Sequence, residues 1–540
     1  MSGRISWLTS LAPNSRWHRG MVGRQIVLGS AFAGALALGS CGLRQATSES
    51  DLAVVEIAFA GSSTAALFDP PPAGKDKRWV KVRYRDVDHR EGAGKVALRG
   101  FSAWHHGRSK PSLRLKPKGK RRRGPASVEL SRPEDPLAIC NWLPDHIGAG
   151  LGLMHEHSEP VRLLLNGRDC GVYLRSIRPG DDLCDAAGRP RSAFFKGDSL
   201  GDRRHLDLWA SSASWRTFGT WQPSATEALE ELLAALREPP TAGSLRRLAG
   251  AIDLEQAARL MAVASLVGSI HADAVHNHVM YYNPETGRIE PLLWDANGFG
   301  IHAEPELAVN VARHPLAARL LCSPRFLHRR NEVLWEQMRG PASAEKLIAA
   351  VDQRLAEIDA ALQTDPEIAR LVLRRGVFEL DEVGYAGLQG ARREFLDFVE
   401  RREAYLERWF QRARVSMVPL AKDPSHTLVT VFGDVAVKLS RTDGAEVLSA
   451  DGRDAALLWP GIREALVDDR QHQESDGRGV SAPHGVPAAL QYVVACPVAQ
   501  LNLRNAFTGQ AVSAEPSPEA SKSRSVHPWS ESAITPSSPR

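Results

Sequence analysis

The chain has 540 residues, which is long enough for two or three domains and a sizeable core. Its apolar share of 43% and charged share of 24% are those of an ordinary soluble protein. A net charge of +5 is small at this length, so we expect no nucleic-acid partner. Positive charge gathers in Lys110–Arg123, which we interpret as a solvated loop, with a phosphate- or membrane-facing patch as the alternative.

Residues 1–41 have the features of a bacterial lipoprotein signal peptide. Basic residues precede the apolar run Ile26–Leu38, which is too short to span a bilayer as a mature helix. The run ends in a sequence that resembles a lipobox, so Cys41 is the expected site of lipid attachment. A start at Met21 and an N-terminal anchor that is never cleaved remain open. In each case the rest of the chain is expected outside the cytoplasm, at the cell envelope, with a lipid at Cys41 attaching it to the membrane on the periplasmic side.

The cysteines after Cys41 lie in a compartment that permits disulfides. They number five, at positions 140, 170, 184, 322 and 496, so at least one stays free or pairs with another chain. Cys170 and Cys184 flank a strand-turn segment and are a candidate pair. The sequence has no CxxC motif and no Cys/His ligand pattern, so we do not expect structural zinc.

Residues 42–52 are predicted to be a polar tether, and residues 53–415 the main domain. Its N-terminal part is expected to be rich in strands, because apolar and polar residues alternate in short runs. These runs are Leu52–Ala60, Trp79–Asp86, Lys95–Arg99 and Pro111–Lys116. In the last run the alternation places Arg114 and Lys116 on one face of the strand and Leu113 and Leu115 on the other.

A helix and a hairpin are predicted next. Residues 136–153 have a helical pattern. The β-prone runs Val161–Leu165 and Cys170–Ser176 then flank Asn166-Gly167, a strong signal for a tight turn. We therefore expect an antiparallel hairpin there.

Helical patterns dominate the second half of the main domain. Two helices begin with a sequence that matches a capping box, Ser224 with Glu227 before residues 228–236 and Asp253 with Gln256 before residues 254–267. Further helices are predicted over residues 315–322, 324–338, 343–362, 366–374 and 390–413.

The C-terminal part has a different character. Residues 416–511 contain β-like runs at 427–439 and 489–496, which predict a small β-rich module. Residues 512–540 are rich in Ser and Pro with little apolar periodicity, which is typical of a disordered tail.

The stretch His271–Gly300 carries most of the candidate chemistry. Residues 279–282 and 288–294 are β-prone and flank Asn283-Pro-Glu-Thr-Gly, which predicts a hairpin. Asp295 follows the second strand, and Gly298 and Gly300 allow a tight backbone path. In isolation, such an aspartate is most simply a solvated turn residue.

Three polar residues at the ends of this hairpin suggest a shared site. Asp273 and Asn277 precede the first strand and Asp295 follows the second, so the hairpin brings them to one end. Carboxylate and carboxamide oxygens suit Mg²⁺ or Mn²⁺. With Lys116 as a cation from elsewhere, these are the parts of a phosphoryl-transfer site, which works by positioning and charge neutralisation.

A different interpretation uses the histidines. The side chains of His271, Asp273, His276, His278 and Asp295 are also ligand types for zinc or iron, which would make the protein a metal-dependent hydrolase. Against it, His276 and His278 alternate with Asn277 at the start of a strand, and the chain has no HExxH helix.

Over residues 53–412 the sequence resembles the spore coat protein H (CotH) kinase-like family. The resemblance is carried, in order, by Leu98-Arg-Gly-Phe-Ser, Lys110-Pro-Ser-Leu-Arg-Leu-Lys, Asn166-Gly, Gly171-Val-Tyr, Phe195-Lys196-Gly-Asp, Asp273 with Asn277 and Tyr281-Tyr282, Leu293-Trp294-Asp295 with Gly298-Phe-Gly, and Phe398-Val-Glu-Arg-Arg with Tyr405-Leu. The block from Asn277 to Asp295 is the most specific of these motifs.

The resemblance implies an α+β, atypical protein-kinase-like fold with a strand-rich N-lobe and a helical C-lobe. It implies ATP and Mg²⁺ or Mn²⁺ as cofactors, and Ser or Thr of a cell-envelope protein as the acceptor. Lys116 would contact the nucleotide phosphates, and Asp273 would orient or deprotonate the acceptor hydroxyl. Asn277 and Asp295 would hold the metal. Arg114 and Lys196 complete the set of cofactor-binding candidates.

One position departs from the family pattern. The family has a Glu shortly after Gly-x-Tyr, whereas this chain has Ile177 followed by Arg178. The nearest acids along the chain are Asp181 and Asp182. A surface binding or attachment role on a kinase-like scaffold without catalysis is therefore the alternative function.

Overall fold

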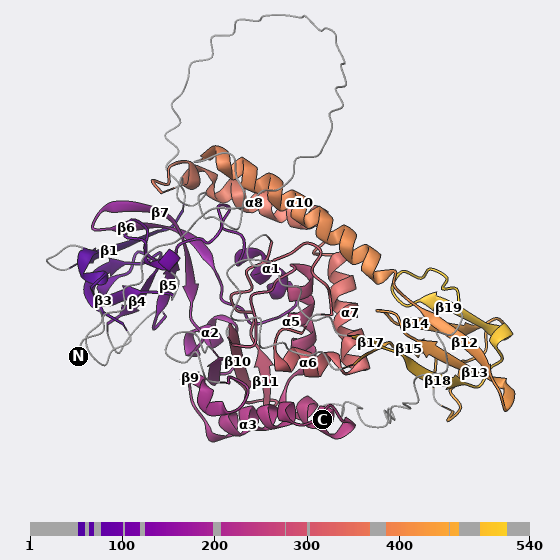
Figure 1. Cartoon of the computed structure of the whole chain (residues 1–540). Helices are drawn as coiled ribbons and strands as arrows, with labels where there is room; N and C mark the ends of the chain where they lie inside the picture. Colours follow the sequence, from indigo (N-terminus) through magenta and orange to yellow (C-terminus); the bar gives the residue numbers. More distant parts are fainter. Residues whose placement is uncertain are drawn as a thin grey trace, which may run out of the picture. The chain divides into compact units, whose positions relative to one another are not determined.

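The computed structural model describes residues 52–59, 64–69, 77–100, 103–118, 125–197, 207–275, 277–299, 303–310, 312–367, 385–452, 454–463 and 486–515 (Figure 1). The predicted signal peptide with Cys41, the tether up to residue 51, the basic run after Lys118, His276, Gly300 and the tail from residue 516 lie outside these residues. The described residues form a mixed α+β structure, as the sequence predicts.

The N-terminal strands close into a barrel. Its strands are β1 (Val54–Phe59), β2 (Val80–Arg85), β3 (Glu91–Leu98), β4 (Leu113–Pro117), β5 (Val128–Ser131), β6 (Glu159–Leu165) and β7 (Arg168–Ile177), in the order β1-β2-β3-β4-β5-β7-β6. Neighbouring strands are antiparallel except β1 and β6, which run parallel. The sequence predicts these strands except β5, and it does not predict that they close into a barrel. The two-lobed kinase-like arrangement stays a prediction.

Alternation places apolar side chains inside the barrel. In β4, Leu113 and Leu115 are buried while Arg114 and Lys116 are partly exposed on the other face, which confirms the predicted faces. The predicted hairpin is formed by β6 and β7 around Asn166 and Gly167, whose φ angles of 51° and 76° suit a tight two-residue turn. Short 3-10 turns follow β1 and β3, at Thr64–Leu67 and Ala103–His106.

A second sheet carries the hairpin of the candidate site. Its order is β11-β10-β8-β9, with β8 (Ala193–Gly197), β9 (Trp215–Gly219), β10 (His278–Asn283) and β11 (Arg288–Pro291). The turn between β10 and β11 confirms the predicted hairpin. The returning strand is shorter than predicted and ends at Pro291. The Leu292 amide still donates to the Val279 carbonyl of β10, but the Leu293 amide donates to the Met154 carbonyl instead, so the chain leaves the sheet there.

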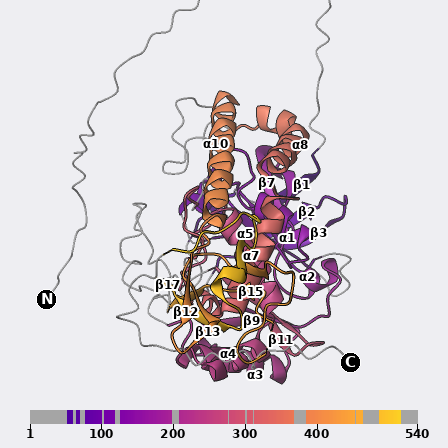
Figure 2. The same cartoon turned by 90° about the vertical axis from the view of Figure 1, so that its right-hand side faces the viewer.

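The helices form the rest of the main core, partly against this sheet and partly against the barrel. They are α1 (Trp142–Gly150), α2 (Asp181–Ala186), α3 (Pro223–Arg237), α4 (Ala242–Ala251), α5 (Leu254–Leu266), α6 (Pro315–Leu321), α7 (Pro324–Met338), α8 (Ala344–Gln363) and α10 (Tyr385–Phe410). Helices α8 and α10 lie side by side (Figures 1 and 2). Most of the predicted helix at 366–374 lies outside the described residues.

One of the two predicted capping boxes is wrong. Helix α3 begins at Pro223, so Ser224 already lies inside its first turn, and the N-cap residue Gln222 makes no side-chain cap. Pro favours the first helical position because its missing N–H would be unpaired there in any case. The other N-cap is confirmed, since Asp253 accepts a hydrogen bond from the Gln256 amide at 2.9 Å.

Buried cations tie the helices to their neighbours. Lys110 pairs with Asp365, just beyond α8, at 2.6 Å, and neither side chain is exposed. Arg402 of α10 is 2% exposed and donates to the carbonyl oxygens of Ser265, Pro305 and Leu307. These contacts connect α8 to the barrel and α10 to the segment that follows the candidate site.

The C-terminal part contains two small three-stranded sheets with a common apolar core. One has the order β12-β13-β18, with β12 (Val415–Leu420), β13 (Asp423–Val431) and β18 (Leu490–Val494). The other has the order β15-β14-β19, with β14 (Val437–Arg441), β15 (Leu457–Leu458) and β19 (Leu501–Asn505). Strands β16 (Gly461–Arg463) and β17 (Val486–Ala488) pair separately. The Asn505 side chain donates to the Phe410 carbonyl at 2.7 Å and joins this part to the end of α10.

The cysteines form no predicted pair, and the helices are not of the membrane-spanning kind, among the residues that the structure describes. All five cysteines at positions 140, 170, 184, 322 and 496 are free and buried, so the candidate pair Cys170–Cys184 is not formed. Of the helices in the described ranges, none combines the length and apolarity needed to cross a bilayer.

Candidate functional site

The hairpin brings Asn277 and Asp295 to the two sides of His271. The Asn277 side chain donates to the His271 carbonyl at 3.1 Å. The Nδ1 atom of His271 lies 2.8 Å from the Asp295 carbonyl oxygen and 3.7 Å from its carboxylate. The two predicted metal ligands are thus linked through one histidine, which has a structural role here.

The backbone around Asp295 is in an unusual conformation. Asn277, Asp295, Asn297 and Phe299 all have positive φ angles, of 64°, 48°, 42° and 59°. Asn and Asp tolerate this region, but for Phe it costs energy, and such residues cluster at functional sites. The glycine in this turn has another role than predicted: a Cβ on Gly298 would lie 2.7 Å from the Val267 Cβ, so Gly298 permits close packing.

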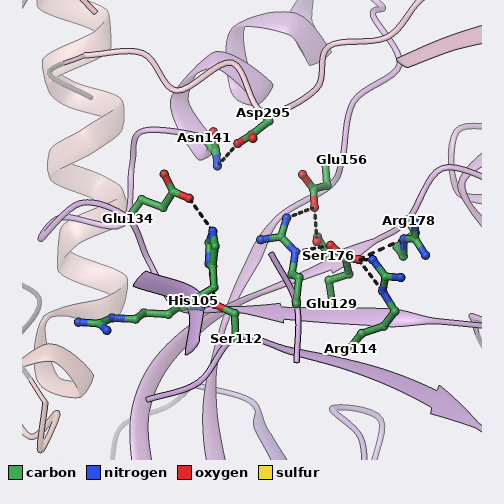
Figure 3. A network of polar contacts seen from close by, with 12 residues as sticks. His105, Ser112, Arg114, Glu129, Glu134, Asn141, Glu156, Ser176, Arg178 and Asp295 are labelled. Carbon is green, nitrogen blue, oxygen red and sulfur yellow. Dashed lines mark hydrogen bonds and ion pairs between the residues drawn. The ribbon is translucent and has the colours of Figure 1, made fainter. Parts of the chain in front are cut away.

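Two asparagines complete the surroundings of Asp295. The Asn141 side chain donates to the Asp295 carboxylate at 3.3 Å (Figure 3). The side-chain oxygen of Asn141 accepts a hydrogen bond from the Asn297 backbone amide at 3.1 Å. Asn297 also donates to Glu134 at 3.3 Å. The start of α1 and the turn after β11 are thereby joined at this carboxylate.

The predicted base Asp273 lies on the segment that leads into β10. Its carboxylate accepts a hydrogen bond from the Val275 amide at 2.8 Å. Burial lowers the pKa of Arg313, and the charges of Glu304 and Asp273 oppose that shift. Arg313 is therefore a cation close enough to interact with the Asp273 carboxylate, and nothing in the sequence marked it as a partner of Asp273.

On the barrel side, a buried carboxylate collects three guanidinium groups. Glu129 of β5 is 2% exposed and pairs with Arg99, Arg114 and Arg178 (Figure 3). Burial alone would raise the pKa of Glu129, but the three arginines outweigh it and hold the pKa well below its usual range. Arg99 also lies 3.9 Å from Glu156, and the charge of Asp295 is among those that raise its pKa.

Two further acids lie near Asp295 in an environment that favours their protonated form. Burial, followed by the charges of Glu156 and Asp295, raises the pKa of Asp145 in α1 well above its usual range. Burial also raises the pKa of Glu156 to about 7, although Arg99 and a hydrogen bond from Ser176 oppose the shift. The two acidic neighbours of Asp295 thus tend toward their neutral, protonated forms.

The stability of the protein is expected to depend on pH through Glu156. Its pKa is 4.5 in the unfolded reference and about 7 when folded, so the folded state binds the proton more tightly. Stability is therefore lost as pH rises from about 4.5 to about 7, by up to about 3 kcal/mol. Glu156→Gln removes this titration, so its unfolding free energy relative to wild type should rise across that window.

Urea unfolding at pH 5, 6, 7 and 8 measures this difference. Glu285→Gln, an exposed substitution in the β10–β11 turn, is the matched control and should leave the shape of the wild-type profile unchanged. A constant offset between Glu156→Gln and wild type at all four values would contradict the prediction.

The three predicted cofactor-binding cations occupy different places. Lys116 lies 4.7 Å from the centre of the Trp79 ring, and burial and Arg114 lower its pKa. Arg114 donates to Glu129 at 2.7 Å. Lys196 of β8 lies 5.1 Å from the ring centre of Trp294, the residue before Asp295.

The donor set fits a magnesium ion completed by other ligands. Asp295 offers a carboxylate and Asn277 a carboxamide oxygen, and Mg²⁺ is commonly held by one or two protein groups together with phosphates and water. In the part of the chain that the structure describes, no three His, Cys, Asp or Glu side chains gather as metal ligands. His278, part of the alternative histidine site, donates instead to the Asp273 carbonyl at 2.5 Å.

Several of these residues carried no usable signal in the sequence. Arg99 lies inside one of the quoted motifs, but nothing marked it as the partner of Glu129. Glu129 and Glu156 look like ordinary strand and loop acids, and only their burial distinguishes them. Asn141 follows a run of apolar residues and precedes α1 without a cap motif.

Comparison with protein families gives one match. Residues 98–406 match the sequence model of a family described as "CotH kinase protein". The match covers more than half of the 540 residues and contains Arg99, Lys116, Asp273, Asn277 and Asp295. No curated protein matches the chain.

Proposed function

The chain belongs to the CotH kinase protein family, and from this we propose that it is an ATP-dependent phosphotransferase, an atypical protein kinase that requires Mg²⁺ or Mn²⁺. Its acceptor would be a Ser or Thr hydroxyl of a cell-envelope protein. We further propose that a lipid on Cys41 attaches it to the membrane on the periplasmic side.

The arrangement at the end of the β10–β11 hairpin is the observation that carries this proposal. Asn277 and Asp295, both next to His271, offer oxygen ligands for the cation. Asp273, on the segment that leads into β10, would orient or deprotonate the acceptor hydroxyl. A bound cation supplies neutralisation of phosphate charge, which is the main demand of phosphoryl transfer.

The cations that would face the phosphates come from the barrel and from the sheet that carries the β10–β11 hairpin. Lys116 and Arg114 lie on β4 of the barrel, and Lys196 lies on β8 beside Trp294. A Lys acts on phosphate as a point charge, and an Arg binds it through two N–H groups. The partial desolvation of Lys116 favours binding of an anion, since an anion restores its charged form.

The surroundings of Ile177, which stands where the family has a Glu, also support the proposal that the protein is catalytic. The Ile177 side chain packs against an apolar cluster, while its neighbours Ser176 and Arg178 contact Glu156 and Glu129. Acidic groups from other elements therefore flank the position where the family has Glu. The two acids nearest along the chain are engaged elsewhere, Asp181 with Thr220 and Asp182 with the Ala126 amide.

Nucleotide binding by the full chain is the first test. Calorimetry should show ATP binding in the presence of Mg²⁺ or Mn²⁺, and radioactive ATP should label protein. Lys116→Met should weaken ATP binding about tenfold, because it removes one charge–phosphate contact. Lys95→Met is the matched control, since Lys95 faces Lys116 across the β3–β4 pair and lies over the same Trp79 ring.

The result separates the two functions. No heat of binding at millimolar ATP would favour a surface binding or attachment role without catalysis. If Lys95→Met and Lys116→Met weaken ATP binding equally, Lys116 has no particular contact with the phosphates, which contradicts the proposal.

A further inference from the structure

The loop that carries Asp273 is held by ring side chains from outside it. The Nε2 atom of His278 donates to the carbonyl oxygen of Asp273 at 2.5 Å. The indole N–H of Trp209 donates to the carbonyl oxygen of Ala274 at 2.9 Å. A carbonyl oxygen can only accept, so both ring nitrogens carry a proton. Two consecutive peptide groups of the loop are therefore fixed in orientation.

These donors belong to a buried ring cluster, formed by Trp209, Trp215, His278 and His314. Trp209 stacks on His314, with 5.5 Å between ring centres and 9° between planes. It meets His278 and Trp215 edge-on, at 5.0 and 5.5 Å. Trp209, Trp215 and His278 are each at most 7% exposed. Such packing leaves the two donating rings little freedom to rotate.

The cluster is anchored at both ends. The Nδ1 atom of His314 accepts from the Ala317 amide at 3.2 Å at the start of α6. The indole N–H of Trp215 donates to the carbonyl of Leu208, next to Trp209, at 2.8 Å. Trp215 thus shares the packing of Trp209 but makes no hydrogen bond from its indole to the Asp273 loop.

The loop backbone determines where the Asp273 carboxylate lies. That carboxylate accepts from the amide of Val275, so it is tied to the same short turn that His278 and Trp209 hold. A rotation of either peptide group would move the carboxylate, and a displacement of about 1 Å at a reacting group lowers rates by about 100-fold.

We propose that Trp209 and His278 are positioning residues, whose hydrogen bonds to two loop carbonyl oxygens hold Asp273 where it meets the acceptor hydroxyl. This inference rests on the proposed phosphotransferase function. It assigns the two rings a role in turnover, with no contact to ATP.

A pair of Trp→Phe variants tests it. Trp209→Phe keeps a ring but loses the donor to the loop, and it should lower kcat about 10- to 100-fold with the KM for ATP within about twofold of wild type. Trp215→Phe removes a similar volume and a hydrogen bond that does not reach the loop, so its kcat should stay within about twofold. Equal losses of kcat in the two variants would overturn the proposal.

Substitutions at His278 add a rescue experiment. His278→Leu removes the donor and should lower kcat as Trp209→Phe does. His278→Gln restores an N–H at similar reach and should recover most of the loss. If the Gln and Leu variants are equally slow, the hydrogen bond to Asp273 is not what matters.

Hydrogen exchange separates failure of this inference from failure of the proposed function. Amides in residues 270–278 should exchange faster in Trp209→Phe than in Trp215→Phe or wild type, whether or not the protein transfers phosphate. A wild type that labels no protein would refute the phosphotransferase proposal alone. Unchanged hydrogen exchange of these amides in Trp209→Phe would refute the positioning role of Trp209 and His278.

Discussion

Replacing Asp295 with asparagine is expected to lower phosphate transfer by about 1,000-fold and to leave the fold intact. Asparagine has the same size and tolerates the φ angle of 48° at this position. It lacks the charge that would hold the cation beside Asn277. The loss relieves the repulsion by which Asp295 raises the pKa of Asp145 and of Glu156, and it also removes the attraction by which Asp295 raises the pKa of Arg99. These effects oppose each other, so the unfolding free energy should stay close to that of wild type.

Labelling with radioactive ATP and urea unfolding of the same preparation measure both parts of this prediction. Asp253→Asn is the matched control, because Asp253 caps α5 away from the site and Asn caps helices equally well. It should label at the wild-type rate. Undiminished labelling in Asp295→Asn would remove the kinase assignment.

Arg402→Met is expected to destabilise the protein by about 3 kcal/mol or more. The guanidinium group of Arg402 is buried and donates to the carbonyl oxygens of Ser265, Pro305 and Leu307. Methionine fills much of the volume but leaves these three oxygens without their donor. Because Pro305 and Leu307 follow the Asp295 turn, transfer activity should fall along with stability.

The neighbouring residue provides the control. Arg401 pairs with Glu306 and Asp397 on the exposed side of α10, and exposed pairs contribute at most about 1 kcal/mol. Urea unfolding of Arg401→Met and Arg402→Met compares the same substitution one residue apart. Similar losses in the two variants would show that the helix tolerates neither methionine, and that the buried contacts are not the cause.

Elements with a local signal were predicted well. The hairpin at Asn166-Gly167, the hairpin between β10 and β11 and the cap at Asp253 each depend on residues a few positions apart. Errors arose where a tertiary contact or backbone chemistry decided the outcome. The apolar pattern continues to Trp294, but Leu293 bonds to Met154 and leaves the sheet. Pro223 begins a helix before the predicted cap Ser224. Barrel closure joins β1 to β6, about a hundred residues apart, and no short pattern encodes it.

By itself, the sequence determined that Asp273, Asn277 and Asp295 lie at one end of a hairpin, because turn residues and strand period place them there. Only the tertiary structure showed what surrounds them. The pairing of Glu129 with Arg99 and Arg178, the raised pKa of Glu156 and the hydrogen bond from Trp209 to the Asp273 loop all depend on burial between segments that are far apart in the sequence. The physical reason is that desolvation and ring packing depend on which parts of the chain come together, and spacing along the chain does not contain that information.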